Sequence, residues 1–433
     1  MLIKQYAAFV SRTNQFANHS MTDAREIAIY GLASEIGSVV SAIKKENLNE
    51  GGALCSPIAK MELREELGDA IWYAFALARI VEEEDGNNIL LNDVEKLREE
   101  IGRNDARGAR IRKVLTQPEV DAFFAEAASF ENNKNRTLSD YQRLAYRTAR
   151  TQGDTLLTVC AAVLTQLGAQ LMRVLLPEIE HELNTQLKDR KISSLLRQIA
   201  WHLCAIASLY DLEMDDVAAA NVEKAGARQR RDDRRTPFHD EKFPAHEQLP
   251  RYFEIEFRPV SNDVTQMYWN GEELGDPLKD QYSISDGYRF HDVMHLANAA
   301  CLGWSPVLRE LMDIKRRSCP ATKDEQDGGR SAVVEELVLK YIHWEGSRRA
   351  NLLHEHLPPD QRPVFQPNEG IPFSVVKTAR DYTIGHEVYA NKYWEWEEAI
   401  AEGYRVFQQL RDHKQGRVIV DLNNRCLKFE PLN

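Results

Sequence analysis

The pattern of apolar and polar positions changes character near residue 236. Up to about residue 230, apolar residues recur three and four apart and Pro is sparse, which is typical of amphipathic helices. Further on, Tyr252–Val260 alternates and predicts a strand, whereas Trp269–Pro277 predicts a turn-rich loop. Helices are expected to resume near Asp286, and the segments Arg417–Leu422 and Cys426–Phe429 predict a closing hairpin. The predicted fold is mainly α, with a smaller α+β carboxy-terminal domain.

Polar and charged breaks suggest where domains end. The break Glu131–Asn135 predicts two helical units, residues 1–130 and 131–236. The charged stretch Arg228–Pro237 predicts an exposed linker before a carboxy-terminal domain at 237–433. Within that domain the charge run Lys315–Arg317 is expected to lie on a solvated surface.

Candidate chemistry is concentrated in the stretch Glu62–Trp72. Glu66 and Asp69 are three apart, so a helix presents both from one face, beside an apolar stripe that packs. A preceding helical stretch, Gly31–Lys45, carries a further carboxylate, Glu35. Carboxylate oxygens are the ligands that Mg²⁺ prefers, so two antiparallel helices bearing these three residues predict a metal site.

This pair of helices resembles the MazG-like all-α nucleoside triphosphate pyrophosphohydrolases, which use an E-x-x-E helix followed by an E-x-x-D helix. The second motif is intact at Glu66 and Asp69, but Ser38 stands where the family has the second Glu of the first motif. The resemblance implies that Glu35, Glu66 and Asp69 hold Mg²⁺, with Mn²⁺ as a substitute.

The resemblance also implies a reaction. A nucleoside triphosphate, ribose or deoxyribose, would be cleaved between its α and β phosphates to a monophosphate and pyrophosphate, with the metal lowering the pKa of the attacking water. Glu65 or Glu62 would supply a further ligand or base, and Lys44 and Lys45 would contact phosphate. Because family members commonly pair their subunits, a homo-oligomer is an open alternative.

A weak internal repeat runs through the helical half. Leu138–Thr148 resembles the opening helix of a second MazG-like unit, and Leu195–Ala205 aligns with the metal-binding stretch so that Trp201 matches Trp72. In this register Leu195 and Gln198 occupy the Glu66 and Asp69 positions, so the second unit lacks the metal carboxylates.

The second unit carries a closing phrase, Asp211–Arg228, that the first unit seems to lack. Its Asn221, Lys224 and Arg228 share one helical face and resemble the Asn and basic positions that approach the nucleotide in family members. The tandem arrangement therefore suggests a division of labour, with carboxylates from the first unit and basic contacts from the second. The alternative is an ordinary solvated helix end, where cations favour the helix dipole.

The densest cluster of the carboxy-terminal part lies between Gly287 and Ala299. His291 and His295 are four apart with Asp292 beside them, which suits a transition metal. A later helix offers Glu335 and Glu336, and Arg289 is a candidate phosphate contact. The block around this cluster resembles the domain that follows MazG-like units in some bacterial proteins. A purely structural hydrogen-bond network is the alternative.

Composition limits the remaining choices. The 433-residue chain has a net charge of -12, which argues against general nucleic-acid binding. Six scattered cysteines without a C-x-x-C pair indicate reduced thiols and a cytoplasmic location, and no apolar run is long enough to predict a membrane partner. Three functions stay open: the pyrophosphohydrolase, a catalytically weakened nucleotide sensor with an effector domain, and a metal-dependent phosphohydrolase centred on His291, Asp292 and His295.

Overall fold

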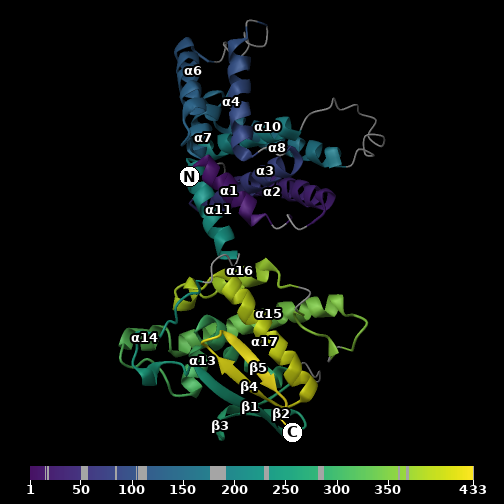
Figure 1. Ribbon diagram of the computed structural model, residues 1–433, viewed down its shortest axis with the longest axis vertical. Helices are drawn as coiled ribbons and strands as arrows, with labels where there is room; N and C mark the ends of the chain where they lie inside the picture. Colours follow the sequence, from purple (N-terminus) through teal and green to yellow (C-terminus); the bar gives the residue numbers. More distant parts are fainter. Residues whose placement is uncertain are drawn as a thin grey trace. The chain divides into compact units, whose positions relative to one another are not determined.

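A computed structural model describes most of the chain (Figure 1). The described residues are 1–14, 16, 19–49, 57–82, 85–103, 105, 115–175, 192–228, 234–280, 287–358, 361–366 and 370–432. Contacts divide the chain into two compact units, Met1–Gly226 and Ala227–Asn433. The predicted fold class is confirmed, because the first unit is helical and the second combines helices with one small sheet.

The described elements of the amino-terminal unit are all helices. They are α1 (Ile3–Thr13), α2 (Met21–Asn49), α3 (Pro57–Glu82), α4 (Gly86–Gly102), α6 (Gln117–Asn132), α7 (Leu138–Arg147), α8 (Gly153–Leu175), α10 (Ile192–Leu209) and α11 (Met214–Arg228). The polar breaks predicted from the sequence fall at or next to helix ends. At the start of α4 the Asp85 side chain accepts a hydrogen bond from the Asn88 amide and caps the helix, as expected of an acidic N-cap.

One hydrophobic core joins the helices on both sides of residue 130. Helix α2 packs against α3 and α8, and α10 packs against the same two helices. Buried side chains from Ile3 through Ala218 form a single cluster. A division of this unit at residue 130 stays a prediction, but both halves contribute to the same core.

Three of these helices are long and apolar enough to cross a membrane by length and composition: Met21–Lys45, Gly153–Val174 and Ile192–Leu209. All three contribute buried residues to the shared core, so their hydropathy has a packing role within this unit. That the chain has no membrane partner stays a prediction.

Matching hydrogen bonds relate the two helical halves. The indole of Trp72 donates to Thr13 Oγ1 (2.8 Å), and the indole of Trp201 donates to Thr148 Oγ1 (2.9 Å). Each Thr closes an opening helix, α1 or α7, and each Trp lies on the helix aligned with its counterpart. The two bonds agree with the repeat register predicted from the sequence.

The carboxy-terminal unit contains a five-stranded antiparallel sheet in the order β3-β2-β1-β4-β5. Its strands are β1 (Tyr252–Ser261), β2 (Val264–Trp269), β3 (Glu272–Lys279), β4 (Gly416–Asp421) and β5 (Cys426–Glu430). The predicted strand and the closing hairpin are confirmed. The predicted loop at Trp269–Pro277 is wrong: Asn270 and Gly271, both at positive φ, form a tight turn that sends the chain back as β3.

Helices flank the sheet of this unit. They are η3 (Tyr288–Phe290), α12 (Val293–Ala297), the π-helical turn η4 (Asn298–Leu302), α13 (Pro306–Leu311), α14 (Pro320–Glu325), α15 (Gly329–Leu353), α16 (Phe373–Asp381), η6 (Glu387–Ala390) and α17 (Tyr393–His413), after the short turn η2 (Ala245–Glu247). Helix α17 contacts α12, β4 and β5 and buries Trp394 and Trp396.

The charge run Lys315–Arg317 is not simply a solvated patch. Arg316 is fully buried, with its guanidinium paired with Asp327 (2.7 Å) and Glu387 (2.6 Å). These two carboxylates, 11 and 71 residues away in sequence, offset the cost of removing this charge from water.

Candidate active site

The carboxylates predicted to bind metal come together between α2 and α3. Glu35 projects from α2, and Glu66 and Asp69 project from α3 one turn apart. One carboxylate oxygen from each residue lies within 4.8 Å of the others, and all three side chains are partly exposed. The helical spacing read from the sequence therefore produces a compact set of oxygen donors.

Residues of α11 complete this cluster from the far end of the helical unit. Asn221 donates from Nδ2 to Asp69 Oδ1 (2.9 Å), and Lys224 donates from Nζ to Asp69 Oδ2 (2.6 Å). The Lys224 ammonium also lies 2.7 Å from Glu65 Oε1. The structure thus brings together the carboxylates of the first half and two polar residues of the second, as the division of labour requires.

A glycine permits this approach of α11 to α3. A Cβ atom placed on Gly68 would lie 3.1 Å from Asn221 Cβ, which is tighter than ordinary van der Waals contact. Tyr6 of α1 then fixes the amide: its buried hydroxyl donates to Asn221 Oδ1 (2.9 Å), so Nδ2 is left to face Asp69. Sequence reasoning missed both Tyr6 and Gly68, because neither carries metal-binding chemistry.

The electrostatics of the cluster reflect crowded negative charge. Burial raises the pKa of Glu66, and the neighbouring carboxylates Asp69 and Glu65 raise it further, while Lys224 and Lys45 act in the opposite direction. For Lys224, partial burial lowers the pKa, but Asp69 and Glu65 outweigh it and the net pKa is raised. A positive charge placed among these carboxylates is therefore favoured.

The other residues predicted near this site lie at its edge. Lys45 is exposed and pairs with Glu62 (3.3 Å), and Lys44 is exposed beside it on α2. Ser38 is half-buried one helical turn beyond Glu35. Arg228 is the last residue of α11, and its side chain lies outside the described residues.

Helix α4 is a second feature that the sequence reasoning missed. Its D-V-E-K stretch, Asp93–Lys96, has the same pattern as N-V-E-K at Asn221–Lys224 of α11. Tyr141 donates to Asp93 Oδ2 (2.8 Å), as Tyr6 donates to Asn221 Oδ1 (2.9 Å). The first unit therefore has a closing helix after all, and its signal was this repeated tetrapeptide.

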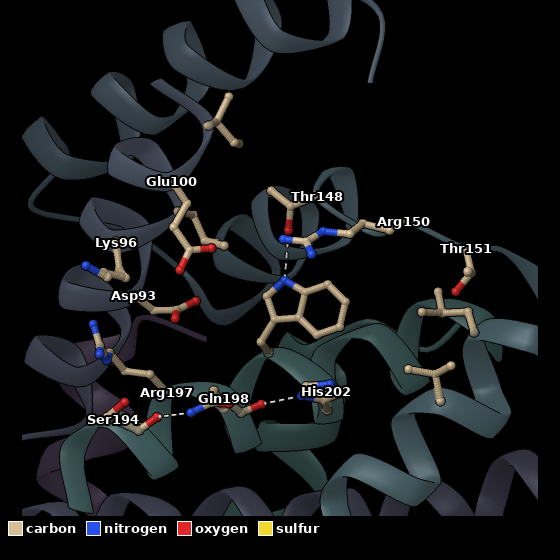
Figure 2. Close-up of a pocket in the computed structure, with 15 residues that line it drawn as sticks. Asp93, Lys96, Glu100, Thr148, Arg150, Thr151, Ser194, Arg197, Gln198 and His202 are labelled. Carbon is tan, nitrogen blue, oxygen red and sulfur yellow. Dashed lines mark hydrogen bonds between the residues drawn. The ribbon is translucent and has the colours of Figure 1, made fainter. Parts of the chain in front are cut away.

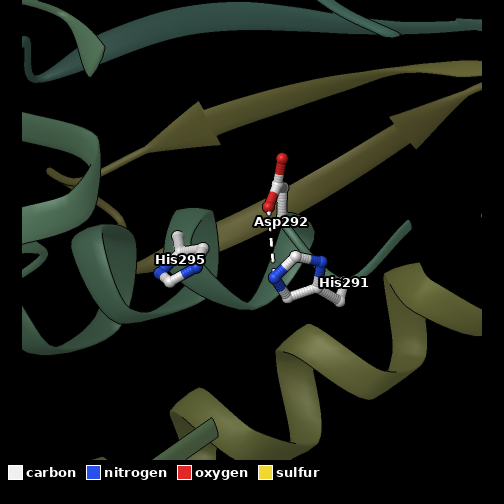
Figure 3. Close-up of side chains that lie close together, drawn as sticks. All are labelled: His291, Asp292 and His295. Atoms are coloured by element: carbon white, nitrogen blue, oxygen red, sulfur yellow. Dashed lines mark ion pairs between the residues drawn. The ribbon is translucent and has the colours of Figure 1, made fainter. Parts of the chain in front are cut away.

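The second predicted cluster also forms, in the carboxy-terminal unit. Ligand atoms of His291, Asp292 and His295 lie within 4.8 Å of one another, and Figure 3 shows the three side chains on one short stretch of chain. His291 precedes α12 in helical conformation, which keeps the one-turn spacing to His295. The Nε2 atom of His291 lies 3.4 Å from Asp292 Oδ1 and 3.9 Å from Glu336 Oε2.

His295 is held between two glutamates of α15. Its Nδ1 lies 3.0 Å from Glu335 Oε1, and its Nε2 lies 3.1 Å from Glu336 Oε1. Glu335 is fully buried and also accepts hydrogen bonds from Asn298, Ser305 and the Val307 amide, each at 3.1 Å. Glu335 therefore has a fixed orientation, whereas Glu336 is partly exposed.

The two histidines differ in their proton affinity. Burial lowers the pKa of His291, with Asp292 opposing it, so this ring favours the neutral form. Burial also acts to lower the pKa of His295, but Glu335 and Glu336 outweigh it and raise that pKa well above its usual value. Arg289 does not join the cluster, because its Nη1 donates to the carbonyl of Asn262 (2.6 Å).

Two protein-family models match the chain, one in each of its two compact units. Residues 24–99 match the MazG nucleotide pyrophosphohydrolase domain, and residues 234–433 match the MazG C-terminal domain. The first match contains Glu35, Glu66 and Asp69, and the second contains the histidine cluster. Neither a curated protein nor a solved structure matches the chain.

Proposed function

Because the chain carries a MazG nucleotide pyrophosphohydrolase domain followed by a MazG C-terminal domain, we propose that its amino-terminal unit hydrolyses nucleoside triphosphates. Cleavage between the α and β phosphates gives the monophosphate and pyrophosphate. The observation that carries this proposal is the meeting of Glu35, Glu66 and Asp69, with ligand atoms within 4.8 Å of one another, inside the matched domain.

The donor set fits a hard divalent cation, since three carboxylate oxygens converge, and burial together with the neighbouring charges of Asp69 and Glu65 raises the pKa of Glu66. We propose that Glu35, Glu66 and Asp69 hold Mg²⁺ or Mn²⁺. When bound, such an ion supplies charge neutralisation and a more acidic water. Glu65, which shares the Lys224 ammonium with Asp69, is the candidate base.

Lys224 and Asn221 have the chemistry to bind and orient the triphosphate. The Lys224 ammonium pairs with Glu65 and Asp69. If a bound metal cation neutralised these carboxylates, the ammonium would be available to attract phosphate oxygens. Asn221 is held by Tyr6, so its amide keeps Asp69 in one orientation. Lys44 and Lys45 provide positive charge at the rim.

A pyrophosphate-release screen of the purified chain tests this proposal. All ribo- and deoxyribonucleoside triphosphates are offered with Mg²⁺, with Mn²⁺ and with EDTA, and Asp69→Asn serves as the matched inactive variant. Metal-dependent release of pyrophosphate and monophosphate, lost in the variant, supports the enzyme. Saturable triphosphate binding without turnover would instead favour the nucleotide sensor, with Ser38 marking the lost ligand.

We propose a metal centre in the carboxy-terminal unit as a second candidate function. Its supporting observation is Glu335, a fixed and buried carboxylate at His295 Nδ1, beside the grouped ligand atoms of His291, Asp292 and His295. A carboxylate behind a histidine is a common arrangement around protein-bound metals. Metal analysis of the chain purified without chelator tests it: at least about one transition-metal ion per chain is expected, and a metal-free chain would favour a structural ion-pair network.

A further inference from the structure

A cavity of about 760 Å³ lies between α4 of the first helical half and residues 148–202 of the second, and Glu35, Glu66 and Asp69 do not line it. It is lined by α4, the segment after α7, α8 and α10 (Figure 2). Figure 2 shows Asp93, Lys96 and Glu100 on one side and Arg197, Gln198 and His202 on another, around open space. Its volume falls within the range of small-molecule sites, about 300–1,000 Å³.

This cavity occupies the repeat counterpart of the candidate active site. Helix α10 corresponds to α3, and α4, with Asp93 bound by Tyr141, corresponds to α11, with Asn221 bound by Tyr6. The positions of Glu66 and Asp69 are taken here by Leu195, which is buried in the core, and by Gln198, which lines the cavity. The cavity therefore repeats the helix arrangement of the candidate active site, but carboxylates at the positions of Glu66 and Asp69 are absent from its described lining.

The two repeats differ at a position beside the aligned tryptophans. In the first repeat, Phe16 follows Thr13 by three residues and packs edge-on against Trp72, with ring centroids 5.8 Å apart. In the second repeat, the residue three after Thr148 is Thr151, which lines the cavity together with Trp201. A small polar residue thus stands where a phenyl ring covers the indole of the other repeat.

The charged lining suits a phosphorylated ligand. Lys96 of α4, Arg150 of the segment after α7 and Arg197 of α10 bring three cations from three elements. Asp93 is buried and bound by Tyr141, and Glu100 adds one further acceptor for sugar or base N–H and O–H groups. Lys96 also pairs with Glu99 (2.9 Å), and one guanidinium nitrogen of Arg197 donates to the Asn92 carbonyl (3.2 Å), so the positive charge offered to an anion comes mainly from Arg150 and Arg197.

We propose that this cavity binds a nucleoside phosphate without a metal and without hydrolysing it, with the base against Trp201 and the phosphate at Arg150 and Arg197. Aromatic stacking and bidentate guanidinium contacts are the usual means of holding such a ligand. The choice of a nucleotide as the ligand rests on the proposed function, because the cavity repeats the helix arrangement of the candidate active site. The cavity itself and the charges that line it do not depend on that function.

Titration calorimetry of the full chain in excess EDTA tests the proposal. The probes are the four ribonucleoside monophosphates and triphosphates, with inorganic phosphate and pyrophosphate as comparisons. Saturable nucleotide binding is expected in the wild type and in Asp69→Asn. Thr151→Phe, which restores the covering ring, and Arg150→Ala, which removes an exposed cation, should each weaken it by about tenfold or more. Arg147→Ala is the matched control, because Arg147 pairs with Glu126 and does not line the cavity.

Three outcomes would overturn the proposal. No saturable binding in EDTA would exclude a metal-free site, and equal affinity for inorganic phosphate would exclude the nucleoside. Binding that survives both Thr151→Phe and Arg150→Ala would place the ligand elsewhere, and melting curves show whether each variant is folded. If the wild type bound nucleotide in EDTA but did not hydrolyse triphosphates in the presence of metal, only the proposed function would be rejected.

Discussion

Replacing Gly68 with Ala tests whether the approach of α11 to α3 builds the candidate active site. The new methyl would lie 3.1 Å from Asn221 Cβ, 3.4 Å from Asn221 Nδ2 and 3.5 Å from the Val217 carbonyl oxygen. Since Cβ is fixed to the backbone, a rotamer change cannot relieve the closest contact, and α11 itself must move. Overpacking of this kind costs about 1–3 kcal/mol of unfolding free energy.

A matched control is available on the neighbouring helix. Gly37 of α2 is exposed, and a Cβ there would meet nothing within 4 Å, so Gly37→Ala keeps only the gain in helix propensity. That gain is about 0.8–1 kcal/mol and applies equally at Gly68. The difference between the variants isolates the packing cost, and at about 2–4 °C per kcal/mol their melting temperatures should differ by about 2–12 °C.

The same displacement should separate Asn221 and Lys224 from Asp69. We therefore expect pyrophosphate release to fall by about tenfold or more in Gly68→Ala, since a misplacement of this size at a catalytic group is costly. Gly37→Ala should retain the wild-type rate. Calorimetric melting and the pyrophosphate assay measure both effects. Equal melting temperatures and equal rates for the two variants would refute the reasoning that close helix approach positions the site.

Further predictions address metal binding and pH. Asp69→Asn should lower metal-dependent pyrophosphate release at least about 100-fold without unfolding the chain, and full turnover at saturating Mg²⁺ would remove this site from consideration. Ser38→Glu should tighten Mg²⁺ binding in an activity titration, because a charged ligand is restored; unchanged affinity would mean that Ser38 does not face the metal. Burial raises the pKa of Asp93 to about 7. The folded chain then keeps a proton that the unfolded chain releases above about pH 4, so stability is lost as the pH rises from about 4 to about 7. Asp93→Asn should melt higher than wild type at pH 8 but not at pH 4, and a parallel pH dependence of the two proteins would contradict this. If the carboxy-terminal cluster holds a metal, His291→Ala and His295→Ala should each lose it, whereas reduced stability in a metal-free protein would show a structural network.

The parts of the fold that sequence reasoning captured depend on local periodicity. Helices such as α3 and α10, and the strand at Tyr252, are specified by spacing within one segment. The loop predicted at Trp269–Pro277 failed because Gly and Pro suggested turns, whereas pairing with β2 made Glu272–Lys279 a strand. The burial of Arg316 was equally out of reach, since Asp327 and Glu387 become its partners only through tertiary folding.

The candidate active site also has a part that could be predicted from the sequence and a part that could not. Glu66 and Asp69 are neighbours on one helix, and the family resemblance adds Glu35, so the carboxylate set could be named from the chain. The orientation of Asn221 depends on Tyr6, which lies 215 residues away in sequence. Arg289 has suitable chemistry for phosphate, but its bond to Asn262 turns it away from the histidines. Long-range partners of this kind leave no periodic signal in the sequence.

The exchange of closing helices explains why the second repeat matters although it lacks metal carboxylates. Helix α11 ends the second repeat, yet Asn221 and Lys224 serve Asp69 of the first. Helix α4 ends the first repeat, yet Asp93 is bound by Tyr141 and lines the cavity of the second. The carboxylate cluster and the cavity therefore each need residues from both repeats. A chain cut near residue 130 would lack Lys224, the cation that pairs with Glu65 and Asp69. The second repeat lacks counterparts of the candidate metal carboxylates, but it keeps the helix that completes the cluster of the first repeat.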